Sequence, residues 1–164
     1  MKGFRDTVAL IVVLVLQSTV LYRLEIGGIR PDLLVAYVVY FGWMRGPIPG
    51  TLGGFGIGLF QDLDASGPLG LNALAKTVVG FLVAKAGFRV HRSNVIVRFA
   101  FFFAAMLVHD LIYYGVATGG DGGAFIKQFF LKSIPTAVYT AVVTLVLLAV
   151  AERITQRRLL TDET

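Results

Sequence analysis

The sequence consists of long, almost uninterrupted blocks of apolar residues joined by short polar or basic segments. Of its 164 residues, 56% are hydrophobic and only 15% are charged, and the mean hydropathy is +0.77. Soluble domains are about 25% charged, and their apolar residues form periodic stripes instead. Blocks of this length suit the hydrocarbon of a bilayer, where a helix satisfies its own backbone hydrogen bonds. The sequence therefore predicts an all-α membrane protein.

Six such blocks predict a single integral membrane domain, a six-transmembrane-helix bundle. No A-x-A arrangement of small residues follows the first block, so we expect a retained helix rather than a cleaved signal peptide. Residues 124–132 are too short and too charged to span, and their aromatic side chains beside lysines predict an interfacial segment. The predicted spans cover about residues 8–24, 31–44, 48–63, 69–88, 95–117 and 134–151.

The formal charge of +5 comes mostly from Lys and Arg in the segments between the blocks and at the ends of the blocks. These residues form no continuous basic face, so we predict no nucleic-acid partner. Cytoplasmic segments are enriched in Lys and Arg, and the larger set therefore predicts that both termini are cytoplasmic. Anionic lipid is the expected partner of the basic segments at the inner surface. The predicted inner set is Lys2, Arg5, Arg45, Lys85, Arg89, Arg92, Arg98, Arg153, Arg157 and Arg158, and the outer set is Arg23, Arg30, Lys127 and Lys132.

The segment 48–63 is unusually rich in glycine for a helix. Gly50, Gly54 and Gly58 form two overlapping G-x-x-x-G steps, which let helix backbones approach closely in a membrane. Two uses of this face stay open, namely packing within the protein and docking of a partner. A re-entrant hairpin made of this segment and 31–44 is a further alternative.

Three polar side chains are predicted to lie at one depth in the outer third of the membrane. Lys76, Asp110 and Gln17 are each about 10 Å along their segment from its outer end. Charges inside a membrane are costly without a partner, so we expect Lys76 and Asp110 to form an ion pair. Alternatively, Lys76 snorkels alone and Asp110 meets interfacial water. Neighbouring polar side chains complete this layer: Asn72, His109 and Tyr113.

The polar layer is better interpreted as a structural clasp than as a proton relay. A relay would need titratable groups that continue to the cytoplasmic side, and the predicted spans show none. His91 and His109 lack metal-ligand spacing, and the absence of cysteine excludes thiol chemistry. The glycines of residues 54–58 follow no strand and precede no Walker lysine. We therefore predict no catalytic residue, no metal site and no cofactor.

The order of motifs between Arg30 and about Gly80 resembles the family of the rod shape-determining protein MreD of bacteria. Length, the number of predicted helices and the short tails agree with that family over the whole chain. The resembling residues are Arg30-Pro31-Asp32-Leu33-Leu34, Arg45-Gly46-Pro47, then Gly54, Gly58, Leu59 and Asp62, and finally Pro68-Leu69-Gly70-Leu71-Asn72-Ala73-Leu74.

The resemblance implies a non-enzymatic scaffold subunit of the cell-elongation machinery in the bacterial inner membrane. It implies an MreC-like bitopic partner and, in the larger complex, the actin-like MreB, RodA and a penicillin-binding protein that makes sidewall peptidoglycan. It also implies a fold similar to that of the substrate-binding subunits of energy-coupling-factor transporters. We expect Asp62 and the run Leu69, Gly70, Leu71 and Asn72 to form the outer edge of an interaction surface.

Two other functions are weaker alternatives. A vitamin-like binding subunit of a transporter would fit the implied fold, but residues 8–16 lack the Ala-x-x-x-Ala pattern that such subunits often show. A small ion or lipid transporter would use Lys76 and Asp110, but the sequence shows no inverted repeat.

Overall fold

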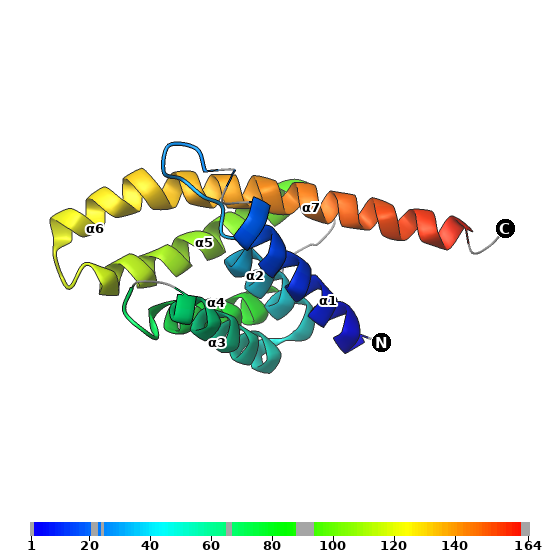
Figure 1. The fold of residues 1–164 in the computed structure, drawn as a ribbon, viewed down its shortest axis with the longest axis horizontal. Coiled ribbons are helices and arrows are strands. Elements are labelled where there is room, and N and C mark those ends of the chain that lie inside the picture. Colours follow the sequence, from blue (N-terminus) through cyan, green and yellow to red (C-terminus); the bar gives the residue numbers. More distant parts are fainter. Residues whose placement is uncertain (1, 21–22, 24, 65–66, 88–93, 162–164) are drawn as a thin grey trace.

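The computed structural model describes residues 2–20, 23, 25–64, 67–87 and 94–161, and all regular elements within them are helices (Figure 1). This confirms the all-α prediction. The predicted bounds differ by at most two residues except at the first and last segments. The elements are α1 (Lys2–Val15), the π-helical η1 (Leu16–Val20), α2 (Leu33–Arg45), α3 (Pro47–Asp64), α4 (Leu71–Gly87), α5 (Val95–Ala117), α6 (Gly122–Gln128), the π-helical η2 (Phe129–Ser133) and α7 (Ile134–Thr161).

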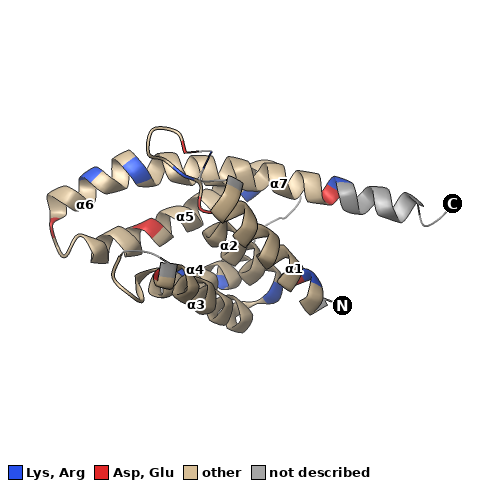
Figure 2. Ribbon diagram, viewed as in Figure 1, with Lys and Arg blue, Asp and Glu red and all other residues tan. Residues whose placement is uncertain are grey.

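Two helical stretches in the described part of the chain are long and apolar enough to cross a membrane. They are Val95–Ala117 and Gly122–Arg153, and the helix Leu33–Arg45 is apolar but shorter. Figure 2 shows most of α5 and α7 without charged residues, whereas charged residues lie in α6 and toward the C-terminal part of α7. Length and composition therefore agree with a membrane protein.

The helices form two packed groups that meet along α4 and α5. In the first group α2, α3 and α4 contact one another, and the α3–α4 contact is the most extensive in the molecule. In the second group α5 packs against α7, and α4 and α2 contact α5. The start of α1 and the end of α7 lie toward the same end of the molecule, as Figure 1 shows.

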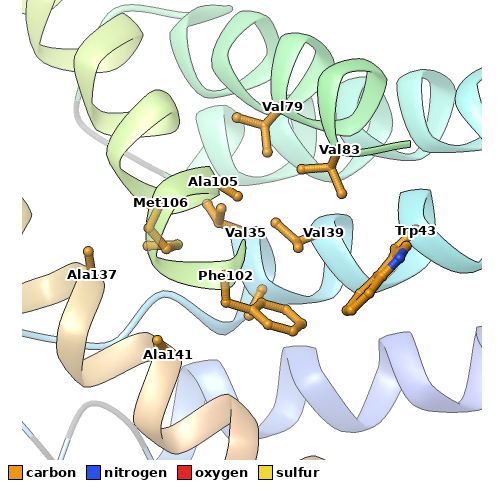
Figure 3. Packing of buried hydrophobic residues seen from close by; sticks show 11 residues of the cluster. Val35, Val39, Trp43, Val79, Val83, Phe102, Ala105, Met106, Ala137 and Ala141 are labelled. Carbon is orange, nitrogen blue, oxygen red and sulfur yellow. The ribbon is translucent and has the colours of Figure 1, made fainter. Parts of the chain in front are cut away.

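The main hydrophobic core lies between α2, α4, α5 and α7 (Figure 3). Val79 of α4 and Phe102 of α5 are completely buried in it. Trp43 closes one end of this core and donates its indole N–H to the Gly87 carbonyl oxygen at 2.9 Å. A Cβ at Gly87 would lie 2.2 Å from the Trp43 ring, so the ring requires glycine there. The core thus joins the two groups of helices.

A second, smaller core holds α1 against the bundle. Leu10 and Leu14 of α1 pack on a cluster that contains Tyr37 of α2 and Ile57 of α3. The Tyr37 hydroxyl also donates to the backbone carbonyl of Asp6 at 2.9 Å. One face of α1 therefore meets the protein, while the rest of it is exposed.

The C-terminal part of the chain is one continuous helical rod rather than two segments (Figure 1). We predicted an interfacial segment at 124–132 and a new helix at 134–151, but η2 joins them without a break. Pro135 has no N–H to donate into a helix. Just before it, the Ile134 N–H donates to the Phe129 carbonyl, five residues back. This wider π-helical turn carries the helix past the proline.

Candidate functional site

The site is built around the first turn of α2, where Asp32 is the N-cap residue. Its Oδ1 accepts hydrogen bonds from the N–H groups of Leu34 at 2.9 Å and Val35 at 3.1 Å. Its own N–H donates to Thr140 Oγ1 of α7 at 3.0 Å. A carboxylate at an N-cap satisfies N–H groups that have no partner within the helix. Asp32 thereby fastens α2 to α7.

The residues on either side of Asp32 complete this first turn. Pro31 is buried and has no N–H that would need a partner. The Leu33 N–H donates to Gln17 Oε1 of η1 at 2.9 Å. Three separate parts of the sequence therefore meet at the start of α2.

Asp62, near the end of α3, caps the start of α4, and α3 and α4 together form a helical hairpin. Its two carboxylate oxygens accept four hydrogen bonds, each of 3.0 Å, from the N–H groups of Gly70, Asn72 and Ala73 and from Asn72 Nδ2. Gly70 adopts φ +92°, a left-handed conformation that favours glycine. Asp62 is 4% exposed. Its role in this structure is to close the α3–α4 turn.

Of the run from Leu69 to Asn72, Leu69 is 70% exposed, whereas Leu71 and Asn72 are buried. The sequence run predicted to form an outer edge is therefore divided. Asp62, Leu71 and Asn72 face the protein interior, and Leu69 faces outward.

Lys76 of α4 is fully buried, and its ammonium group meets three acceptors. Its Nζ lies 3.3 Å from Asn72 Oδ1, 3.3 Å from His109 Nε2 and 3.6 Å from Asp32 Oδ2. An ammonium group has three donors and no acceptor, so this environment is matched to it. His109 consequently accepts at Nε2 and carries its hydrogen at Nδ1.

The carboxylate nearest to Lys76 is Asp32, not the predicted Asp110. Helical side chains point toward the N-terminus of their helix. Lys76 therefore extends back past Asn72 toward the start of α4, where Asp32 also lies. Asp110 Oδ1 lies 2.9 Å from His109 Nδ1 and accepts its hydrogen. The two charges predicted to pair are linked through His109.

A cavity of about 560 Å³ opens beside this network. The polar side chains predicted to share one depth all lie at it or beneath it. Lys76 does not line the cavity but contacts the lining residue Asn72, and Tyr113 stacks on His109 with ring centroids 6.1 Å apart. The cavity lining includes Gln17, Asp32, Asn72, His109, Asp110 and Tyr113.

The glycine face of α3 is an internal packing surface. A Cβ at Gly54 would lie 2.2 Å from the Lys76 carbonyl oxygen, and one at Gly58 would lie 2.5 Å from Ala73 Cα. A Cβ at Gly50 would lie 2.7 Å from the Gly80 carbonyl. Of the two uses left open by the sequence, the structure shows contact within the protein.

Sequence reasoning did not single out Thr140, Gln61 or Tyr114, which all contribute to the site. Thr140 lies in an apolar stretch without any motif, and only the fold brings it to Asp32. Gln61 lies next to the motif residue Asp62 and lines the cavity. The Asp32–Lys76 contact could have been expected from one general rule, namely that a helical side chain points toward the N-terminus of its helix.

Several residues named in the sequence analysis lie outside the part of the chain that the structure describes. The basic segment 89–92, which includes His91, lies outside the described residues, as do the side chains of Arg157 and Arg158. Within the described part, no group of three or more His, Cys, Asp or Glu side chains is placed to hold a metal ion.

Comparison with known proteins adds an independent result. A family model for the rod shape-determining protein MreD matches residues 5–157, which is nearly the whole chain. No curated protein and no solved structure matches it. The match includes the capped helix starts, the buried lysine and the glycine face described above. The chain therefore belongs to the MreD family of rod shape-determining proteins.

Proposed function

We propose that this protein is a non-enzymatic membrane scaffold of the cell-elongation complex. Membership of the MreD family implies a role in determining rod shape, and this family match is the observation that carries the proposal. The motif carboxylates support a structural role, because Asp32 and Asp62 are both engaged as helix caps.

The proposal includes six membrane spans in the inner membrane, with both termini in the cytoplasm. The excess of Lys and Arg on one side supports this orientation. The start of α1 and the end of α7 lie at one end of the molecule, as an even number of spans requires (Figure 1). The α6–η2–α7 rod then serves as the last span, with α6 extending toward the outer interface. Similarity of the bundle to energy-coupling-factor subunits belongs to the same proposal.

The proposed direct partner is an MreC-like bitopic protein, with MreB, RodA and a penicillin-binding protein in the larger complex. The outer turn between α3 and α4 supports a contact there, because Leu63 and Leu69 are 72% and 70% exposed beside the rigid cap of Asp62. A rigid apolar edge can bind a partner helix with little loss of conformational entropy. None of the comparisons supports the alternative of a vitamin-binding transporter subunit.

Depletion of the protein in its rod-shaped host tests the function. Depleted cells are expected to widen and become round. Cells that receive a copy of the gene are expected to remain rods. Cells that elongate normally after depletion would contradict the scaffold function.

Leu69→Ala tests the contact surface, with Leu82→Ala on α4 as the matched control. Both side chains are exposed, but Leu82 lies toward the other end of the helix. We expect Leu69→Ala to reduce co-purification of the MreC-like partner several-fold at unchanged protein level, and Leu82→Ala to leave it unchanged. Equal capture by both variants would place the contact elsewhere.

A further inference from the structure

We propose that the cavity between α2, α4, α5 and α7 binds the headgroup of a zwitterion that carries a primary ammonium group and a phosphate. The cavity volume of about 560 Å³ is within the range of small-molecule sites. This inference does not depend on the proposed scaffold function. It rests on the polar and charged side chains that line the cavity.

The first observation is a carboxylate oxygen that the buried network leaves unused. Lys76 pairs with Asp32, and its Nζ also lies 3.3 Å from His109 Nε2. Asp110 uses Oδ1 for His109, and its Oδ2 accepts no hydrogen bond from any described residue. Asp110 lines the cavity and is 8% exposed. Asp110 therefore offers a carboxylate oxygen at the cavity as an acceptor for an ammonium group of a ligand.

The second observation is a further acceptor and a pair of aromatic rings at the cavity. Gln61 lines the cavity, and its buried Oε1 has no hydrogen-bond partner among the described residues. Buried polar groups in proteins almost always have a partner, so this oxygen marks a polar position beside the cavity that the described residues leave unsatisfied. The rings of Tyr113 and Tyr114 meet edge to face at 5.3 Å beside it. Acceptors and aromatic faces together form a suitable environment for an ammonium group.

The third observation is the positive charge at the cavity lining. Lys132 of η2 and Arg30 both contribute to it, on segments that flank the α2 start. Arg30 also pairs with Glu25, whereas Lys132 is exposed. A lysine ammonium is a compact point charge that binds phosphate. The lining therefore offers an acceptor for the ammonium and a cation for the phosphate of one headgroup.

Native mass spectrometry of the purified protein in detergent tests the proposal. The probes are phosphatidylethanolamine and phosphatidylglycerol with the same acyl chains, which share the phosphate but differ in the ammonium. We expect about tenfold or greater preference for phosphatidylethanolamine, because a charged hydrogen bond is added. Equal binding of the two lipids, together with no binding of soluble O-phosphoethanolamine, would overturn the proposal.

Asp110→Asn is expected to abolish the preference, and Glu152→Gln is the matched control. Glu152 is an exposed carboxylate on α7, away from the cavity, and pairs with Arg98. The same charge change there should leave the preference intact. A preference that survives Asp110→Asn would contradict the assignment of the ammonium to Asp110.

Lys132→Gln provides a second variant in case Asp110→Asn does not fold. Its side chain is exposed, so the fold should tolerate the change. We expect binding of both lipids to fall several-fold, and unchanged binding would overturn the phosphate assignment. Soluble O-phosphoethanolamine distinguishes the source. If it binds wild type but the lipids show no preference, the ligand is a free zwitterion with the same chemistry.

Discussion

Helices α3 and α4 meet backbone to backbone, whereas α5 and α7 meet through side chains. Between α3 and α4, glycines such as Gly54 and Gly58 leave no room for a Cβ. Between α5 and α7, Phe102 and Met106 pack beside the small Ala137 in the main core (Figure 3). In the α3–α4 contact, the backbones touch at successive turns of α3, and no side chain can be added between them. The second contact leaves space beside the C-terminal part of α5 and the start of α7, where Tyr113 and Thr136 line the cavity.

This difference predicts where the protein tolerates change. Close backbone contact cannot adapt to added volume, because interiors are packed at crystal-like density. Long side chains can adjust their rotamers. We therefore expect substitutions in the α3–α4 hairpin and its buried lysine to be costly, and those on the outer face of α7 to be mild.

The largest effect is expected for Lys76→Met, which leaves Asp32 without its ion-pair partner. Breaking a buried pair from one side costs about 3–5 kcal/mol. We expect this loss in the free energy of unfolding, measured by denaturant titration in detergent. Lys85→Met is the control, because Lys85 is exposed at the end of the same helix. A loss of similar size in both variants would show that the buried network is not responsible.

A double-mutant comparison then identifies the partner of Lys76. If Asp32 is the partner, Asp32→Asn combined with Lys76→Met should cost less than the sum of the single changes. Asp110→Asn should show weaker coupling, since His109 lies between the two charges. Stronger coupling to Asp110 would favour the pair predicted from the sequence.

The next largest effect is expected for Gly54→Ala, with Gly56→Ala as its match on the same helix. The added Cβ at Gly54 would meet backbone atoms of α4, whereas Gly56 has nothing within 4 Å. Overpacking costs about 1–3 kcal/mol. Gly56→Ala should be neutral or stabilising by helix propensity. Thermal unfolding in detergent measures both, and equal stability would mean that α3 and α4 can separate freely.

A smaller loss is expected for Asp62→Ala, which removes the cap of α4. Loss of an N-cap costs about 0.5–2 kcal/mol, and the buried site should lie at the upper end. Asp121→Ala, at the exposed N-cap of α6, should lie at the lower end. Hydrogen exchange at the first turns of α4 and α6 measures this. A larger effect for Asp121→Ala than for Asp62→Ala would contradict the expectation that the buried cap of α4 contributes more than the exposed cap of α6.

The smallest effect is expected for Val142→Ala on the outer face of α7. Val142 is 47% exposed, and exposed substitutions stay within about 0.5 kcal/mol. Stability should be unchanged, and cell shape should be maintained in a complementation assay. Loss of rod shape at unchanged stability would identify this face as a contact for a partner.

The helices could be predicted well from the sequence, but the connection between α6 and α7 could not. Segment 95–117 was predicted with the bounds that α5 has. The continuous rod of α6 and α7 was missed, because Pro135 reads as a helix start unless the preceding turn is π-helical. Hydropathy locates apolar stretches, but it contains no information on local hydrogen bonding.

The sequence predicted that Lys76 and Asp110 lie near each other, but it did not predict the partner of Lys76 in the structure. Depth follows from counting residues along a helix, and this placed Lys76 with Asp110. Pairing also depends on the rotation of each helix and the direction of each side chain. These place Asp32 nearest to Lys76 and His109 between Lys76 and Asp110.

The sequence by itself determined the class of this protein: a helical membrane protein with a glycine face and a few polar residues within its apolar segments. The reason is that the composition of a segment decides whether it is more stable in hydrocarbon or in water. Tertiary structure alone decided that the glycines face α4, that Thr140 meets Asp32, and that polar side chains from distant parts of the chain line one cavity. These are contacts between residues distant in the chain, and they depend on how the helices rotate against one another.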